Sequence, residues 1–157
     1  MLEWLLAVAS IGGVVALAAD HWRQIKKMRT WGAAHGLPLM PPVSRMRLAR
    51  AIEALEPTMG GLWDGLYVRL RTRPVWVPSP RGFSRAWRIS IRVTAEGDLV
   101  PFSAPPPGYF SGLEVRGREL RVFTWGGVPM EEIPRYLNDA VAYARALTPA
   151  QPQRPAD

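Results

Sequence analysis

The sequence predicts an α+β fold, in which an N-terminal transmembrane helix precedes an antiparallel β-sheet or small barrel with a C-terminal amphipathic helix packed on it. Three observations predict this order. Residues 4–19 carry no charge. Apolar and polar side chains alternate with a period of two in parts of residues 66–93, as in half-buried strands. Apolar residues recur at helical spacing over residues 130–147.

The uncharged N-terminal stretch predicts the membrane helix. Its 16 residues from Trp4 to Ala19 would span about 24 Å as a helix, against a hydrocarbon core of roughly 30 Å. Trp4 and Trp22 stand near its two ends and are the expected membrane-interface anchors. Ala16-Leu17-Ala18 also resembles a signal-peptidase site, and Glu3 before the apolar stretch resembles a type IV pilin start. No basic residue precedes the stretch, which disfavours both alternatives.

Basic residues follow the apolar stretch and predict its orientation. They are Arg23, Lys26, Lys27 and Arg29. By the positive-inside rule, a single-pass protein of the cell (inner) membrane would have its N-terminus outside and its C-terminal domain in the cytoplasm. Small residues within the stretch have the spacing at which two membrane helices approach closely, and the candidate helix–helix contacts are Ala9, Gly12, Gly13 and Ala16.

Composition changes along the chain predict four segments. Residues 1–36 form the transmembrane helix with a basic juxtamembrane extension, which Gly36 and Pro38 end. Residues 37–59 form a proline-rich linker and a short amphipathic helix from about Arg45 to Leu55. Residues 60–148 form the antiparallel α+β domain, and residues 149–157 a disordered tail.

Within the domain, turn signals separate the predicted strands. Asp64-Gly65 predicts a hairpin turn before a strand over residues 66–72. Residues 74–82 contain three prolines and a glycine and predict a loop before a strand over 87–93. A short strand is expected at 99–103. A hairpin should join residues 113–115 to 120–125 through Arg116-Gly117-Arg118.

Three segments of the chain resemble a known group of proteins. These are Gly61-Leu-Trp-Asp-Gly65-Leu-Tyr-Val, the hairpin Leu113-Glu-Val-Arg-Gly-Arg-Glu-Leu-Arg-Val122, and the closing helix Tyr136-Leu-Asn-Asp-Ala-Val-Ala-Tyr-Ala-Arg-Ala-Leu147. In this layout the chain is similar to uncharacterised single-pass membrane-anchored proteins of GC-rich bacteria. The resemblance implies a bacterial membrane protein and carries no functional residues across.

The side chains that catalysis needs are scarce. The chain has no cysteine, which excludes disulfides and thiolate chemistry, and its two histidines, His21 and His35, match no metal motif. Turns and helix ends account for most of the acidic residues, whereas Glu114 and Glu119 are expected to face each other across a hairpin. We therefore predict no catalytic residues, no metal site, no cofactor and no small-molecule substrate.

Arginines dominate the positive charge of the chain, whose net charge is +7. Strand alternation predicts one cationic face on the sheet, formed by Arg69, Arg71, Arg73, Arg88 and Arg92. Tyr67 shares this face, and Trp76 lies in the neighbouring predicted loop. The face is interpreted as a solvated or partner-covered surface, as a contact with anionic lipid, or as a nucleic-acid surface. The membrane tether favours lipid over nucleic acid.

Together these observations predict a membrane-anchored binding module without enzymatic activity. Its expected partners are the lipid bilayer and either a protein partner, as an accessory or scaffold subunit of a membrane-associated assembly, or further copies of the chain. The alternative is a peripheral module whose arginine-rich face binds anionic lipid headgroups or, less favoured, nucleic acid.

Overall fold

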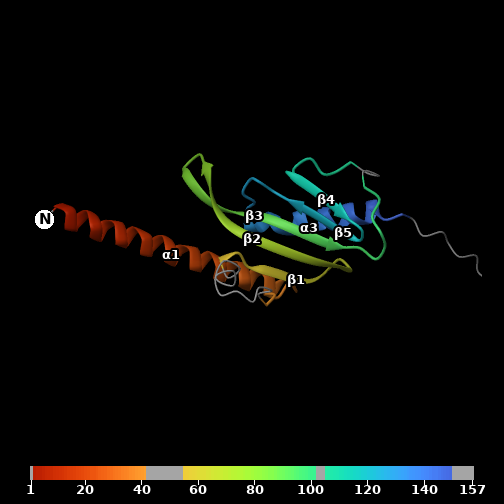
Figure 1. The fold of residues 1–157 in the computed structure, drawn as a ribbon, viewed down its shortest axis with the longest axis horizontal. Helices are drawn as coiled ribbons and strands as arrows, with labels where there is room; N and C mark the ends of the chain where they lie inside the picture. Colours follow the sequence, from red (N-terminus) through yellow and green to blue (C-terminus); the bar gives the residue numbers. More distant parts are fainter. Residues whose placement is uncertain (1, 42–54, 102–104, 150–157) are drawn as a thin grey trace, which may run out of the picture.

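The computed structural model describes residues 2–41, 55–101 and 105–149, and of residues 2–12 and 14 it describes the backbone alone. Figure 1 shows a long N-terminal helix leading into a sheet, with a second helix packed against the sheet. The elements in chain order are α1 (Leu2–Ala34), β1 (Thr58–Trp63), β2 (Leu66–Ser79), β3 (Gly82–Thr94), β4 (Gly112–Arg116), β5 (Glu119–Phe123), the 3-10 helix η1 (Met130–Glu132) and α3 (Ile133–Leu147).

The five strands form one open antiparallel sheet in the order β1-β2-β3-β5-β4. The α+β class and the antiparallel sheet are therefore confirmed, and of the two predicted alternatives the open sheet is the correct one. Asp64 and Gly65 form the β1–β2 turn with φ angles of 46° and 80°. Two consecutive positive φ angles are typical of the type I′ turn that Asp-Gly favours.

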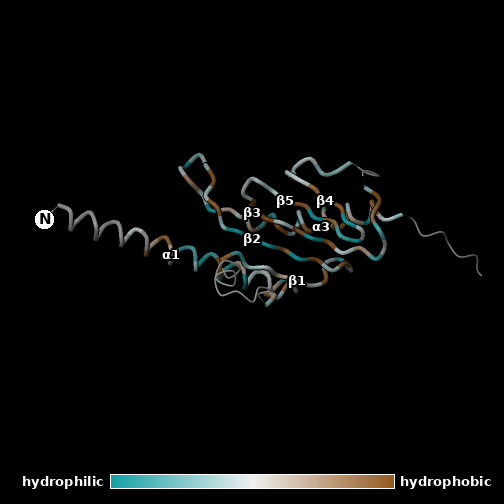
Figure 2. The backbone as a smooth tube through the Cα atoms, in the orientation of Figure 1, coloured by the Kyte–Doolittle hydropathy of each residue, from teal (hydrophilic) through white to brown (hydrophobic). Residues whose placement is uncertain are grey.

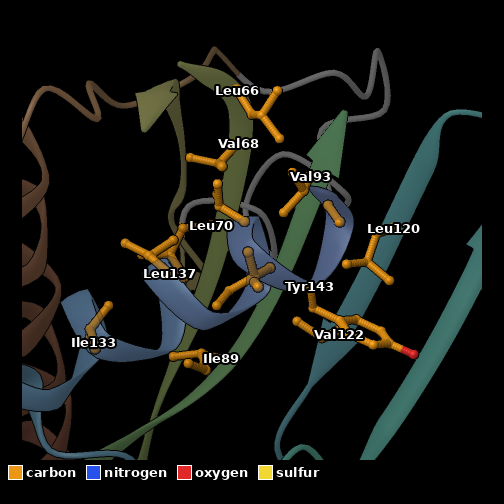
Figure 3. Packing of buried hydrophobic residues seen from close by; sticks show 14 of the residues in the cluster. Leu66, Val68, Leu70, Ile89, Val93, Leu120, Val122, Ile133, Leu137 and Tyr143 are labelled. Carbon is orange, nitrogen blue, oxygen red and sulfur yellow. The ribbon is translucent and has the colours of Figure 1, made fainter. Parts of the chain in front are cut away.

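The core lies between α3 and one face of the sheet, which we call the inner face. Figure 3 shows side chains of β2, β3 and β5 pointing toward α3, among them Leu70, Ile89 and Val122. Ile133 and Leu137 of α3 meet them and are fully buried. Each such side chain contributes roughly 1.5–3 kcal/mol on burial. Figure 2 shows hydrophobic and hydrophilic residues alternating along β2 and β3, as a sheet with one covered face requires.

The C-terminal part of α1 packs on the same face beside β1. Ile25 and Met28 are completely buried. A Cβ atom at Gly61 of β1 would overlap the carbonyl oxygen of Gly36, and one at Gly32 would overlap the side chain of Met59. The helix end and the strand therefore approach more closely than any residue larger than glycine permits. The chain after α1 also covers the outer edge of β1, because the Met40 amide donates to the Thr58 carbonyl oxygen at 2.8 Å.

β2 and β3 pair along almost their whole length, to the partners Ser79 and Gly82. The loop predicted over residues 74–82 is therefore wrong, and the segment is instead the end of a two-stranded arm. Pro74 lies opposite Trp87, whose amide and carbonyl groups bond Val128 and so point away from β2. The nitrogens of Pro74 and of Pro78, four residues on, consequently face the open edge of β2. A proline there removes no hydrogen bond of the ladder.

Several other predictions have an outcome in the structure. The continuation of α1 to Ala34 and the helix over residues 130–147 are confirmed, the latter as η1 followed by α3. The strand predicted at 99–103 is wrong for residues 99–101, where the Leu99 amide instead bonds the Gly117 carbonyl oxygen at 2.9 Å. Residues 102 and 103 lie outside the described residues, as do residues 45–54 of the predicted short helix and residues 150–157 of the predicted tail.

Where residues are described in full, none of the helices combines the length and the apolar character that crossing a membrane requires. The predicted span of residues 4–19 falls mostly on residues 2–12 and 14, of which only the backbone is described. The transmembrane helix therefore stays a prediction.

Candidate functional site

The second face of the sheet, which α3 does not cover, carries most of the strand arginines. We call it the outer sheet face. The register places Arg69 opposite Arg92 and Arg73 opposite Arg88. Arg92 in turn lies opposite Arg121 of β5. The predicted gathering of arginines from two strands is therefore present, and β5 extends it. The polar and aromatic residues on this face include Tyr67, Arg69, Arg71, Arg73, Arg88, Ser90, Arg92, Thr94, Glu114, Arg116, Glu119, Arg121 and Phe123.

Three glutamates also reach this face. Glu56 lies 2.6 Å from Arg71 and 3.7 Å from Arg73, measured between nitrogen and oxygen. Glu119 lies 3.5 Å from Arg92, and Glu114 lies 3.4 Å from Arg121. The outer sheet face thus has seven arginines and three glutamates, so it is cationic but not uniformly so. Because these pairs are largely exposed, each contributes at most about 1 kcal/mol to stability.

A shallow groove of about 320 Å³ crosses the outer sheet face. Phe123 and Trp125 are among the residues that line it, with their rings edge to face at 5.6 Å between centroids. The Arg88 guanidinium lies 5.7 Å from the centre of the Trp125 ring, and its Nε donates to the Trp125 carbonyl oxygen at 3.1 Å. The rest of the lining is mostly charged or polar side chains, among them Glu56, Arg71, Arg73, Glu114 and Arg121, together with Ile89. A flat groove with aromatic and guanidinium groups is suited to binding a surface rather than to enclosing a small molecule.

The remaining sequence candidates lie on α1, apart from the outer sheet face. The juxtamembrane cations Arg23, Lys26 and Lys27 are exposed, and Arg29 is partly buried. Trp22 is exposed, as are Gly13 and Ala16 of the predicted helix–helix contact. The side chains of Trp4, Ala9 and Gly12 lie outside the described residues.

His35 and Tyr109 each make contacts that stabilise the fold. His35 stacks on Trp31 with 4.4 Å between ring centroids, and its Nδ1 lies 2.8 Å from the Trp31 carbonyl oxygen. The Tyr109 hydroxyl donates to the Asp139 carboxylate of α3. Burial, and then this carboxylate, raise the pKa of Tyr109 well above its ordinary value. A phenol that holds its proton so firmly is a hydrogen-bond donor and not a general base, so this contact fixes the loop before β4 onto α3.

The described residues include no cluster of three or more acidic or histidine side chains with the spacing of a metal site. The prediction that Glu114 and Glu119 face each other is wrong. The β4–β5 turn contains only Gly117 and Arg118, so that Glu119 lies opposite Arg116 and Glu114 opposite Arg121.

Sequence reasoning missed the two aromatic residues of the groove and the partners of the arginines. Phe123 and Trp125 lie at the end of a strand that was predicted, and the alternation Glu119-Arg121-Phe123 on β5 was the available signal. Glu56 lies beyond any local pattern, because it approaches β2 only through the turn before β1. Comparisons with protein-family models, with curated protein sequences and with solved structures found no match for this chain.

Proposed function

We propose that the chain is a membrane-anchored, non-enzymatic binding module and serves as an accessory subunit of a membrane-associated protein assembly. On this proposal α1 crosses the inner membrane and the sheet domain lies on the cytoplasmic side, where a protein partner docks on the outer sheet face. The uncharged stretch of residues 4–19 and the basic residues after it support the anchor and its orientation.

One observation carries the proposal. The inner face of the sheet is filled by α3 and the end of α1, whereas the outer face bears exposed arginines around a groove with two aromatic residues. Arginine, tyrosine and tryptophan are the residues most enriched where proteins bind proteins. A stably packed domain with one such open face is suited to recognition.

The direction of the sheet favours a protein over lipid headgroups as the occupant. Figure 1 shows β2 and β3 extending in nearly the same direction as α1. If α1 crosses the bilayer, the sheet stands roughly perpendicular to the membrane, and neither of its faces is turned toward the lipid headgroups. The three glutamates on the outer sheet face also lower its attraction for anionic lipid and nucleic acid, while they provide hydrogen-bond acceptors for a protein partner. Anionic lipid or nucleic acid remains the second candidate because the arginines are in excess.

Extraction from the native membrane tests the proposal. The tagged full chain is solubilised in mild detergent, and its size and co-eluting molecules are measured at about 0.1 M and about 1 M salt, where charges are screened over roughly 10 Å and 3 Å. We expect a stoichiometric protein partner that remains bound at the higher salt, because aromatic packing is less sensitive to salt than exposed ion pairs.

Other results would contradict the proposal in different ways. Recovery of the chain in the soluble fraction, without detergent, would remove the anchor. The chain could also elute without another protein and carry anionic lipid or nucleic acid that salt displaces. This result would indicate that the outer sheet face binds lipid or nucleic acid and not a protein.

A further inference from the structure

We infer that the tip of the β2–β3 arm is a second membrane contact, which rests on the interfacial layer of the bilayer that α1 is proposed to cross. The arm comprises residues 75–79 and 82–86, joined by Pro80 and Arg81. The inference rests on the proposed membrane anchor and adds a specific surface and a lipid partner to it.

The arm exposes large aromatic side chains to solvent. Phe83 is 71 % exposed and Trp76 is 52 % exposed. Both belong to the same face of the ribbon, since Phe83 pairs with Pro78, and Trp76 with Arg85. While Phe83 stays in water, the fold loses the stabilisation that burying its ring would give. An apolar patch at the end of a ribbon, away from the core, is typical of a surface that another phase or molecule covers.

An ion pair ties this face of the arm to α1. Arg85 bonds the carboxylate of Asp20, and its guanidinium lies 3.6 Å from the centre of the Trp76 ring. The Arg85 side chain is only 19 % exposed, so the contact is well packed. Asp20 is also the first charged residue after the uncharged stretch of residues 4–19. The contact therefore fixes the arm at the point along α1 where the apolar stretch ends.

The arm continues beyond this contact toward the membrane. Figure 1 shows the arm and the N-terminal half of α1 leaving the sheet on the same side. Gly82 lies three residues beyond Arg85, which is about 10 Å along a strand. On α1, Val15 and Leu17 lie on the membrane side of Asp20 and are about as exposed as the arm aromatics, at 61 % and 60 %. The tip therefore lies beyond the Asp20 contact, on the side of the sheet where apolar side chains of α1 face outward.

The chemistry of the tip suits the headgroup region. Tryptophan and arginine gather where a bilayer meets water, since the ring enters the apolar boundary and the cation meets phosphate. Residues 74–86 contain Arg81 and Arg85 and no acidic residue, which is complementary to anionic headgroups. Trp22 on α1 is exposed near the same level. The arm and α1 would thus contact the bilayer at two points. Two contacts would prevent the sheet from rotating about α1 and would keep the outer sheet face roughly perpendicular to the membrane.

Depth-dependent fluorescence quenching tests this inference, and the absence of native cysteine makes the labelling specific. Single cysteines replace Ser84 beside Phe83, Leu17 on α1, and exposed Ala142 on α3. Each variant of the full chain is labelled with an environment-sensitive fluorophore and reconstituted in vesicles of zwitterionic and anionic phospholipid that contain a lipid spin-labelled near the headgroup. We expect a blue shift and loss of most fluorescence at positions 84 and 17, and neither at position 142.

A matched variant identifies the cause. Phe83→Ser should abolish most of the quenching at position 84 in the Ser84→Cys background, and it should leave the quenching at position 17 unchanged in the Leu17→Cys background. Quenching at position 17 without quenching at position 84 would overturn the tip contact and leave the anchor intact. Absence of quenching at position 17 would instead overturn the proposed anchor. Equal quenching at all three positions would mean general adsorption of the chain to lipid and would overturn the inference as well.

Discussion

Replacing Gly61 with alanine is expected to lower the free energy of unfolding by about 1–3 kcal/mol, the usual cost of forcing an extra carbon into a filled space. The added methyl would overlap the backbone carbonyl oxygen of Gly36 and meet the Leu37 side chain. A backbone carbonyl cannot rotate away as a side-chain end can, so the chain directly after α1 must shift from β1. This glycine is therefore a principal determinant of how the predicted anchor is joined to the sheet.

Thermal unfolding followed by circular dichroism measures this effect. A change of 1 kcal/mol shifts the midpoint by roughly 4–8 °C in a domain of 60–100 residues. Gly108→Ala is the matched control, because a Cβ atom at Gly108 meets nothing within 4 Å. Equal midpoints for the two variants would show that the close approach of α1 to β1 contributes nothing to stability.

Reversing the charge of two arginines on the outer sheet face is expected to abolish binding of the protein partner. Arg69 and Arg73 are exposed on β2, where they lie opposite Arg92 and Arg88 of β3 respectively. Breaking one hydrogen-bonded charge pair within an interface costs about 2–5 kcal/mol, so Arg69→Glu combined with Arg73→Glu should reduce the recovered partner by more than about tenfold. Folding should be little affected, since both side chains lie in solvent.

The control for this experiment makes the same change in net charge on the opposite side of the domain. Arg135 and Arg145 are exposed on α3, where they pair with Asp139 and Asp64 respectively. Arg135→Glu combined with Arg145→Glu should leave the recovered partner nearly unchanged. Comparable losses in the two double variants would attribute binding to overall charge and not to the outer sheet face.

Local sequence patterns predicted most of the sheet and the closing helix. The alternation around Val68 and Ile91 fixes which side of each strand is buried, and Asp64-Gly65 specifies its turn directly. These two features suffice to assign the arginines of β2 and β3 to one face of the sheet. The register then places them opposite each other, as that assignment requires.

The errors have identifiable physical causes. Pro74 and Pro78 indicate a loop by composition, yet both nitrogens face an open edge, which only the pairing with β3 reveals. At the β4–β5 hairpin, the two-residue turn lies one residue later in the chain than a Glu114–Glu119 pair would place it, which changes every cross-strand partner, so that Glu114 and Glu119 each lie opposite an arginine. Glu56 reaches Arg71 through tertiary folding, and no local pattern anticipates such a contact.

For two tryptophans, packing determines whether the side chain is buried or exposed, and the periodicity of the sequence does not predict it. Trp31 lies outside the clear apolar patterns, but it packs against the core and stacks on His35. Trp76 also lies outside them and is exposed beneath Arg85 on the arm. The first contributes to the junction of α1 with the domain, and the second belongs to the proposed membrane contact.

Site-specific crosslinking from the outer sheet face tests the central claim most directly. A photoreactive amino acid replaces Ser90, which lies between Arg71 and Phe123 across the strands, and in a parallel sample replaces Ala142 on α3. Illumination of native membranes should yield one discrete protein adduct from position 90 and none of that mass from position 142. An adduct formed only with lipid or nucleic acid at position 90, or the same protein adduct from both positions, would contradict a protein-binding role for this face.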